Sequence, residues 1–470
     1  MARESWSSRV GFVLAAVGSA VGLGNIWRFP WMTAENGGSA FLLVYLGIVV
    51  AVGVPGLLAE FVLGRRSRKS PVGALRDLSG SKHWGHVGLV SVLAGLVLLS
   101  FYSVVGGWIL RYVGASATGA YFGTPGAYFD AISYGPAAAG YHVLFLGLTA
   151  GVVYGGVRGG IERATTIMMP VIVVVLVGLA AWVTGLPGAA DAYGFYLSFD
   201  LAYVRANLLD ILLSAAGQAL FTLSVGAGTM LTYASYVGED RSLPADATLV
   251  AVFNTAVGVL AGLVVFPLLF STPNVDVATS GPGALFVGIA TAFSTLPAGR
   301  LLAVGFFAVV ALAALSSSIS MLEIVVAYLV DERDLSRQRA TAGVASVVLA
   351  TGTVSAFSPT VFGFLAGTVV DVVLTTGLLA FVVFTAWVLG ADAVDEFARG
   401  TRFSTGLGDA WRVLVGVVIP PFLVFTLFVG LGDVVGLSLS TWQVAIAAVA
   451  VAAVLVGVVV RTRRPFETPA

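Results

Sequence analysis

Cysteine is missing from the chain, and charged side chains are few. None of the 470 residues is Cys, which excludes disulfides, thiolate metal sites and haem attached through cysteine. Asp, Glu, Lys and Arg make up only 10% of the residues, and the 24 basic and 24 acidic side chains cancel, which removes the electrostatic case for a nucleic-acid partner. With only three histidines and no convergent cluster of His and acidic residues, we predict that the protein is not an enzyme.

Apolar residues dominate the composition instead. They account for 58% of the chain and recur in runs of about 20 residues, long enough to cross a hydrocarbon core of roughly 30 Å as helices rather than as barrel strands. We therefore predict an all-α integral membrane protein with one transmembrane domain over residues 1–470. Its twelve spans are expected at residues 10–36, 40–64, 86–112, 141–157, 161–185, 209–237, 247–270, 299–330, 339–356, 362–390, 409–432 and 441–460.

The connections between these spans differ in charge. Basic residues gather at the N-terminus, in alternate connections and in the C-terminal tail, whereas the connections near 113–140, 186–208, 271–298 and 433–440 carry almost none apart from Arg205. The positive-inside rule then places both termini in the cytoplasm of a multi-pass plasma-membrane protein, in agreement with an even number of spans. The long connections 186–208 and 271–298 are either lids over an entrance or ordinary surface loops.

Glycine and polar residues interrupt two of the spans. Span 1 contains Gly18-Ser-Ala-Val-Gly-Leu-Gly-Asn25, and span 6 contains Phe221-Thr-Leu-Ser-Val-Gly-Ala-Gly228. Each glycine weakens a helix by roughly 1 kcal/mol relative to alanine, so both helices are candidates for a break at mid-membrane. Freed carbonyls suit Na⁺ and a half-helix N-terminus suits a carboxylate, the pattern of a transporter built from repeats. The alternative is close helix packing through small residues, and the paired positions favour transport.

Ionisable and hydroxyl groups also occur within or near the spans, where they are costly and therefore functional hypotheses by default. The ionisable residues are Arg28, Glu60, Asp210, Glu323 and Asp371. Three consecutive hydroxyls, Ser316 to Ser318, either ligate a cation or bond back to carbonyls of their own helix.

Several segments together resemble the neurotransmitter:sodium symporter family. They are GSAVGLGNIWRFP at residues 18–30, ENGG at 35–38, GQALFTLSVGAGTMLTYASYV at 217–237, ALSSSISMLE at 314–323 and DERDLSR at 331–337. The resemblance implies a LeuT-type fold with interrupted helices 1 and 6, in which residues 10–185 and 209–390 form inverted five-helix repeats and residues 409–460 form two peripheral helices. It also implies sodium-coupled symport of an amino acid or amine by alternating access.

The same resemblance implies two sodium sites built from neutral oxygen ligands, which suit a hard cation. The first would use the Ala20 carbonyl with Asn25, Thr222 and Asn254, completed by a substrate carboxylate. The second would use the carbonyls of Gly18, Val21 and Ala313 and the hydroxyls of Ser316 and Ser317.

Gly22 indicates the class of substrate. Monoamine carriers of the family have an aspartate at this place, so glycine leaves a charge missing that an α-amino acid carboxylate would restore. The carboxylate would lie near Leu23, Gly24 and Tyr102, and the ammonium near Ala20, Phe221, Thr222 and Ser224. Leu98, Tyr102, Phe221, Ser224, Ala227, Ser317 and Met321 would line the side-chain pocket.

Ala227 replaces a phenylalanine of some relatives, so we expect a bulky apolar or aromatic amino acid. Another small amine or osmolyte, a sensor that binds without transport, and an ion channel remain alternatives.

The expected gates match the family less closely. A cytoplasmic latch would use Arg3 and Asp331 with Trp6, Ser235 and Tyr236. Arg28 matches the outer-gate arginine, but Gly363 or Ala366 occupies the place of its usual aspartate. Asp371 is the nearest acid, and it either replaces that aspartate or pairs elsewhere.

Two further features come from the resemblance. Gly258 stands where chloride-independent relatives have a carboxylate and chloride-dependent ones a serine. The negative charge that balances Na⁺ would then come from chloride or from an acid placed elsewhere, and the neutral donors at Tyr45, Gln218, Thr222 and Asn254 favour chloride.

Gly160 and Pro170 match an arrangement that lets span 5 unwind and open a water path, although the pair also suits an ordinary helix end.

Overall fold

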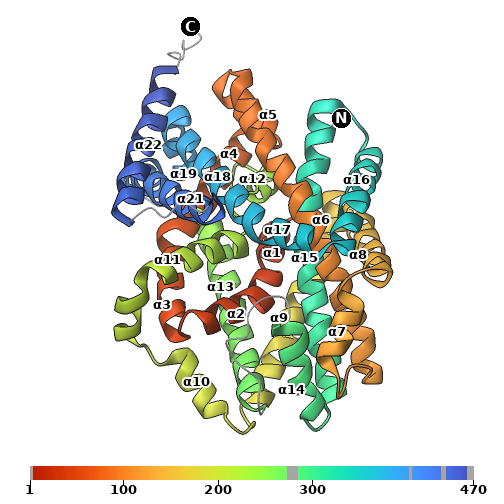
Figure 1. Cartoon of the computed structure of the whole chain (residues 1–470). Helices are drawn as coiled ribbons and strands as arrows, with labels where there is room; N and C mark the ends of the chain where they lie inside the picture. The colour runs from red at the N-terminus through yellow and green to blue at the C-terminus, as the bar shows by residue number, and fades with distance from the viewer. Residues whose placement is uncertain (1–3, 273–283, 402–404, 436–440, 463–470) are drawn as a thin grey trace.

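The computed structural model describes residues 4–272, 284–401, 405–435 and 441–462, and these residues are helical throughout with short connections (Figure 1). The first half contains five spans and two short connecting helices. The spans are α1 (Arg9–Ala20) with η1 (Gly24–Arg28) and α2 (Phe29–Glu35); α3 (Ser39–Ile48) with η2 (Val49–Gly53) and α4 (Val54–Ser67); α6 (Lys82–Thr118); α8 (Pro136–Tyr154); and η3 (Val157–Glu162) with α9 (Arg163–Val183). The connecting helices are α5 (Pro71–Ser79) and α7 (Pro125–Ser133).

The second half repeats this order of long helices. Its spans are α11 (Leu201–Thr222) with α12 (Thr229–Ala234); α13 (Leu243–Phe270); α15 (Gly299–Arg333); α16 (Arg337–Phe357); and α17 (Pro359–Phe364) with η5 (Leu365–Val369), α18 (Val370–Val383) and η6 (Phe384–Leu389). Shorter helices connect them: α10 (Ala189–Leu197), η4 (Ala284–Ile289), α14 (Ala290–Thr295) and α19 (Ala391–Ala398). The last two spans are α20 (Thr405–Val413) with η7 (Leu414–Val418) and α21 (Ile419–Val435), and α22 (Thr441–Thr462).

Nine of these helices, within the residues described, are long and apolar enough to cross a membrane by themselves. The pair Arg9–Ala20 and Gly24–Glu35, bent by 48°, makes a tenth. The interrupted pair α11 and α12, together with α22, completes the twelve spans expected from the sequence. The described chain begins and ends at the same end of the bundle, where α5 and α19 lie, and α7, α10 and α14 lie at the opposite end, as an even number of spans requires (Figure 1).

The predicted connection 186–208 is not a plain loop. It contains α10, and α11 begins at Leu201, eight residues before the predicted start of span 6 at 209. The helix bends at Asn207, whose φ of −121° and ψ of 20° are not helical. Asp200 caps the new helix end by accepting a hydrogen bond of 2.9 Å from the amide of Tyr203. Of the other long connection, residues 273–283 lie outside the described part.

Hydroxyl pairs connect the long helices inside the bundle. Ser100 on α6 lies 2.6 Å from Thr351 on α16, and Thr149 on α8 lies 2.8 Å from Ser318 on α15. Such contacts between small polar side chains replace the hydrophobic driving force that helices lose in lipid, with a modest gain of about 0.6 kcal/mol per bond. They hold α6, α8, α15 and α16 together as one block beside the interrupted spans.

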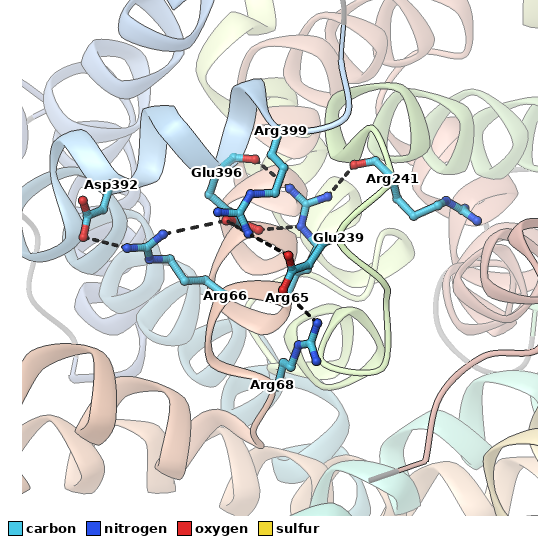
Figure 2. A network of polar contacts seen from close by, with 8 residues as sticks. All are labelled: Arg65, Arg66, Arg68, Glu239, Arg241, Asp392, Glu396 and Arg399. Atoms are coloured by element: carbon cyan, nitrogen blue, oxygen red, sulfur yellow. Dashed lines mark hydrogen bonds and ion pairs between the residues drawn. The ribbon is translucent and has the colours of Figure 1, made fainter. Parts of the chain in front are cut away.

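A buried ion pair connects three parts of the chain near the end that carries α5 and α19 (Figure 2). The Nε of Arg65, at the end of α4, lies 2.5 Å from Oε1 of Glu396 on α19, and both side chains are at most 1% exposed. The same guanidinium donates to the carbonyl oxygens of Glu396, at 2.7 Å, and of Arg241, between α12 and α13. More exposed pairs surround it: Arg66 with Asp392, Arg68 with Glu239, and Arg399 with Glu239 and Glu396.

We expect Arg65→Met to lower the melting temperature of the detergent-purified protein, because buried Glu396 loses its closest cation and keeps only longer contacts, such as that of 3.6 Å with Arg399. Breaking a buried pair in this way costs up to about 3–5 kcal/mol. The double variant Arg65→Met/Glu396→Leu should recover most of the loss. Arg68→Met, which breaks a largely exposed pair, is the matched control and should change the melting temperature little. A double variant as unstable as Arg65→Met would contradict this account of the junction.

Candidate functional site

The first span breaks within its glycine-rich segment. α1 ends at Ala20, Val21 is extended with φ −75° and ψ 101°, and helical structure resumes at Gly24. Residues 18–25 are all buried, so the carbonyl groups freed by the break face the protein interior and not lipid.

The sixth span breaks in the same way between Thr222 and Thr229. Gly226 and Gly228 have φ values of 93° and 75°, which glycine adopts without strain, and Ser224 takes a φ of 53°. Glu60 of α4 satisfies the amides that this break frees. Its carboxylate is fully buried and accepts hydrogen bonds of 2.6 Å from the amide of Gly226 and 3.2 Å from that of Leu231.

The two breaks face each other. The hydroxyl of Ser224 donates to the carbonyl of Ser19 at 2.9 Å, and the side-chain amide of Gln218 donates to the carbonyl of Gly24 at 2.7 Å. A carbon added at Gly24 would lie 3.2 Å from the Cα of Thr222. The unwound segments of spans 1 and 6 therefore form one continuous polar region inside the bundle.

Oxygen atoms converge at the predicted first sodium site. Oδ1 of Asn254, on α13, lies 3.1 Å from the carbonyl oxygens of Ala20 and Thr222 and 3.4 Å from the Thr222 hydroxyl. Asn25 adjoins the cluster and donates to this Oδ1 at 2.9 Å. The two terminal atoms of this amide exchange places by a flip: with nitrogen here the side chain donates to both carbonyls, and with oxygen here it adds a third acceptor beside them. The structure brings together all four residues predicted for this site.

The predicted second sodium site is brought together in part. The Ser316 hydroxyl, on α15, lies 2.9 Å from the carbonyl of Ala313 and 3.2 Å from that of Val21 in the break of span 1. The Ser317 hydroxyl donates instead to the carbonyl of Ser19, at 2.9 Å. Gly18 lies on α1 facing α9, where a Cβ would be 3.1 Å from the side chain of Thr165.

The residues predicted to bind a substrate lie beside these clusters. The amide of Leu23 donates to the Tyr102 hydroxyl at 3.2 Å. Gly22 has no room for a side chain, because a Cβ would lie 2.1 Å from the Ser317 hydroxyl and 2.9 Å from that of Tyr102. The apolar residues predicted to line the pocket are also buried: Leu98, Ala227 and Met321, with Phe221 half-buried.

An ion pair and a cavity lie on the α2 side of the site. Arg28 pairs with Asp371 of α18 at 3.3 Å, and its guanidinium lies 5.0 Å from the centre of the Phe221 ring. Asp371 is thus the observed acidic partner of Arg28. The pair lines a cavity of about 250 Å³, whose wall also includes Thr426 and Gly430 of α21. Sequence reasoning missed this contribution of span 11, because neither residue carries a distinctive signal.

All residues predicted for the cytoplasmic latch except Arg3 lie within the described part of the chain. The indole of Trp6 donates to the carbonyl of Tyr233 at 2.9 Å, and its ring contacts the ring of Tyr236 edge to face. Asp331 accepts a hydrogen bond of 2.8 Å from the amide of Ser70, and Ser235 is buried. Arg3 lies outside the described residues.

Glu323 and Arg337 adjoin this latch. Buried Glu323 accepts hydrogen bonds from the Tyr236 hydroxyl at 2.8 Å and from Arg337 at 2.6 and 3.0 Å. Arg337 also pairs with Glu4 at 2.8 Å. The sequence analysis identified Glu323 only as a costly ionisable group and gave it no partner.

The residues predicted for chloride are all buried. Tyr45 packs against the ring of Phe29, and a Cβ at Gly258 would lie 3.6 Å from the Asn25 amide. The Oε1 of Gln218 is a buried atom without a hydrogen-bond partner in the described part of the chain, and the hydroxyls of Tyr45 and Thr255 are hydrogen-bonded to each other. Thr255 was not predicted, although it directly follows Asn254.

Gly160 lies in η3 and Pro170 inside α9, at the two ends of the segment predicted to unwind.

Two facing broken helices with convergent oxygen ligands, inside a twelve-helix bundle, define a secondary membrane transporter. The chain matches the Sodium:neurotransmitter symporter family over residues 3–122 and 138–462. It is 34% identical to the sodium-dependent transporter YhdH of Bacillus subtilis, covering 88% of this chain and 95% of the relative. It is 30% identical to the sodium-dependent dopamine transporter of Bos taurus, covering 91% and 69% respectively. The crystal structure of MhsT in complex with L-phenylalanine superimposes with a TM-score of 0.81 at 36% identity, covering 91% of this chain and 99% of that one.

The chain belongs to the sodium:neurotransmitter symporter family. It is a sodium-dependent symporter with the LeuT-type fold and not an enzyme, which confirms the family and the fold predicted from the sequence.

We expect Glu60→Gln to lower the melting temperature and broaden the unfolding transition. A glutamine keeps one acceptor oxygen, so one of the amides of Gly226 and Leu231 loses its charge-assisted bond, which is worth about 1.5–3 kcal/mol. The matched control is Glu35→Gln, because Glu35 is exposed at the end of α2. Equal melting temperatures for the two variants would show that Glu60 does not stabilise the break.

Proposed function

We propose that the protein couples two Na⁺ ions to the uptake of one α-amino acid with a bulky apolar or aromatic side chain. Transport proceeds by alternating access as the five-helix repeats, residues 10–185 and 209–390, move relative to each other. The convergence of the Asn254 side-chain amide with the carbonyls of Ala20 and Thr222, at 3.1 Å from each, carries the proposal, because uncharged oxygens of this kind are ligands that suit a hard cation such as Na⁺.

Two sodium ions follow from the two oxygen clusters. The first ion would be held by Ala20, Asn25, Thr222 and Asn254. The second would be held between spans 1 and 8 by the carbonyls of Gly18, Val21 and Ala313, with Ser316 and Ser317. For the second ion, the Ser317 hydroxyl turns from the Ser19 carbonyl, a rotation that a hydroxyl makes easily. Neutral ligands of this kind bind Na⁺ weakly enough to release it.

A carboxylate on the substrate completes the first site. Positions 22, 218, 222 and 254 carry no acidic side chain, and a carboxylate on the transported molecule would supply a negative charge at this site. The carboxylate would accept hydrogen bonds from the amides of Leu23 and Gly24 and from Tyr102. The ammonium would face the carbonyls of Ala20, Phe221 and Thr222 near Ser224.

The size of the side chain follows from the apolar end of the pocket. Leu98, Ala227 and Met321 are buried there, and Ala227 takes little of the volume that a phenylalanine would fill. The L-phenylalanine bound to MhsT, a structure with 36% identity, supports an aromatic or large apolar amino acid.

Two gates would alternate around this site. Arg28 with Asp371 closes the outer side above Phe221, and Trp6 with Ser235, Tyr236, Arg3 and Asp331 closes the cytoplasmic side. The basic residues gathered near the chain termini support cytoplasmic termini in the plasma membrane. Unwinding of span 5 between Gly160 and Pro170 would then admit water to the second sodium site.

Chloride would balance the charge of the first Na⁺. Tyr45, Gln218, Thr222 and Asn254 supply neutral donors there, and Gly258 supplies neither the carboxylate nor the hydroxyl of relatives. The Thr255 hydroxyl, which is hydrogen-bonded to Tyr45, is a further neutral donor that would serve in place of one at Gly258.

Binding of the twenty amino acids to the purified protein tests the proposal, with Na⁺ or K⁺ and with or without chloride. We expect Na⁺-dependent binding of large apolar or aromatic amino acids, strengthened by chloride, because the ions and the substrate carboxylate neutralise one another. Gly22→Asp should abolish it, since its side chain would enter the space of the Ser317 hydroxyl. Binding that is equal in Na⁺ and K⁺ would contradict symport, and binding of amines alone would contradict the proposed substrate.

We expect Ala227→Phe to weaken binding of aromatic amino acids by roughly tenfold or more, and to spare alanine, because the added ring fills the apolar end of the pocket. Competition against a bound radiolabelled amino acid in Na⁺ measures the two affinities. Leu98→Met keeps the side-chain volume and is the matched control. Equal weakening for alanine and phenylalanine would show that Ala227 does not face the substrate side chain.

A further inference from the structure

The N-terminal segment before α1 is bound to the first residues of span 5. Arg158 donates to the carbonyl and the hydroxyl of Ser5 at 2.7 and 2.8 Å. The carboxylate of Glu4 accepts a hydrogen bond of 3.1 Å from the amide of Val157. These contacts join the chain at residues 4–5 to η3, the segment that precedes α9 and contains Gly160.

Glu162, the last residue of η3, makes the innermost of these contacts. Its side chain accepts hydrogen bonds from the amide of Ser7 at 2.9 Å, from the hydroxyl of Ser7, and from the hydroxyl of Ser8 at 3.4 Å. Ser8 is the N-cap residue of α1. The residue is only 6% exposed, so the carboxylate depends on these protein partners and not on water.

The absence of a side chain at Gly11 of α1 leaves the space that this carboxylate occupies. A Cβ at Gly11 would lie 1.7 Å from Oε1 of Glu162 and 2.3 Å from its Cδ, distances that no side chain tolerates. Glu162 therefore lies directly against the backbone of the first turn of α1. A carboxylate at this place also interacts favourably with the positive end of the helix dipole.

The contact between Ser7 and Glu162 joins the beginning of α1 to η3 of span 5, and opening of the cytoplasmic side requires these two elements to separate. α1 packs along α9, where Gly18 faces Thr165 and Met169, and its break supplies the Val21 carbonyl to Ser316. If α1 moves away from α9, the bonds from Glu162 to Ser7 and Ser8 have to break, because they join the beginning of α1 to the end of η3. If η3 uncoils, Glu162 moves with it and releases the same bonds.

We propose that Glu162 is a positioning residue of the transport cycle, which fixes the beginning of α1 to η3 so that uncoiling of span 5 and release of α1 occur as one step. Glu162 touches neither Na⁺ nor substrate in this scheme. It acts through α1, whose position determines whether the Val21 carbonyl reaches the second sodium site. The inference rests on the proposed function, because it assumes that Na⁺ favours the state with the cytoplasmic side closed.

A single cysteine reports the separation of α1 from α9, because the chain has none of its own. Met169 is 4% exposed and faces α1, so Met169→Cys is protected from a thiol reagent while the two helices are in contact. The rate of labelling is measured in detergent, in K⁺ and over a series of Na⁺ concentrations. The background variant is compared with added Glu162→Gln and with added Gly11→Ala, which displaces the carboxylate without removing it.

Both added substitutions should speed labelling in K⁺ and raise the Na⁺ concentration for half-maximal protection by roughly fivefold or more, the usual size of a coupling between two sites. The matched controls are Glu35→Gln, an exposed acid on α2, and Gly147→Ala on α8, where a Cβ meets no atom within 4 Å. They should leave both quantities unchanged. Size-exclusion profiles and melting temperatures establish that each variant is folded.

The outcomes separate this inference from the proposed function. If Na⁺ fails to protect the cysteine in the background variant, the proposed function fails. If Na⁺ protects the background variant and both added substitutions behave like the controls, the function stands and the role of Glu162 is refuted. A lower melting temperature with an unchanged Na⁺ requirement also refutes it, because Glu162 would then serve stability alone.

Discussion

Backbone groups freed in the middle of a membrane have to find partners inside the protein, and the rest of this structure depends on that constraint. The breaks in spans 1 and 6 release carbonyls and amides where no water is available. Glu60 accepts from the amides of Gly226 and Leu231, and the hydroxyls of Ser224 and Ser316 meet the carbonyls of Ser19 and Val21. The carbonyls of Ala20 and Thr222 lie next to the Asn254 amide, and we therefore place the proposed cation site there.

Rigid and movable parts of the bundle are held by different interactions. Hydroxyl pairs between neutral side chains join α6, α8, α15 and α16, and such contacts cost little to bury. Charged pairs lie towards the ends of the helices, where Arg65 meets Glu396 and Arg28 meets Asp371. A half-exposed pair such as Arg28 with Asp371 separates at a small cost, whereas the buried pair at Arg65 keeps its partners together. This difference in burial suits the Arg28–Asp371 pair to the proposed role of a gate and the Arg65–Glu396 pair to that of a fixed junction.

Several features of the site could be predicted from the sequence because they leave local signals. Clustered glycines at 18–24 and 226–228 mark both breaks, and the hydroxyl at Ser316 stands at a recognisable spacing. Other features had no such signal. Glu60 was evident as a costly charge, but its partners are amides 166 and 171 residues away. Thr255, Thr426 and Gly430 are ordinary residues in apolar helices, and only packing brings the last two to the cavity.

The sequence by itself determined the membrane location, the twelve spans, the family and the positions of the two breaks, because hydropathy, glycine content and motifs are properties of contiguous residues. The tertiary structure decided which distant groups meet: Asp371 with Arg28, Asn254 with Ala20, and Glu162 with the first turn of α1. These pairings depend on how helices rotate and cross. A register difference of one residue turns a side chain by about 100° around a helix, so no linear pattern specifies them.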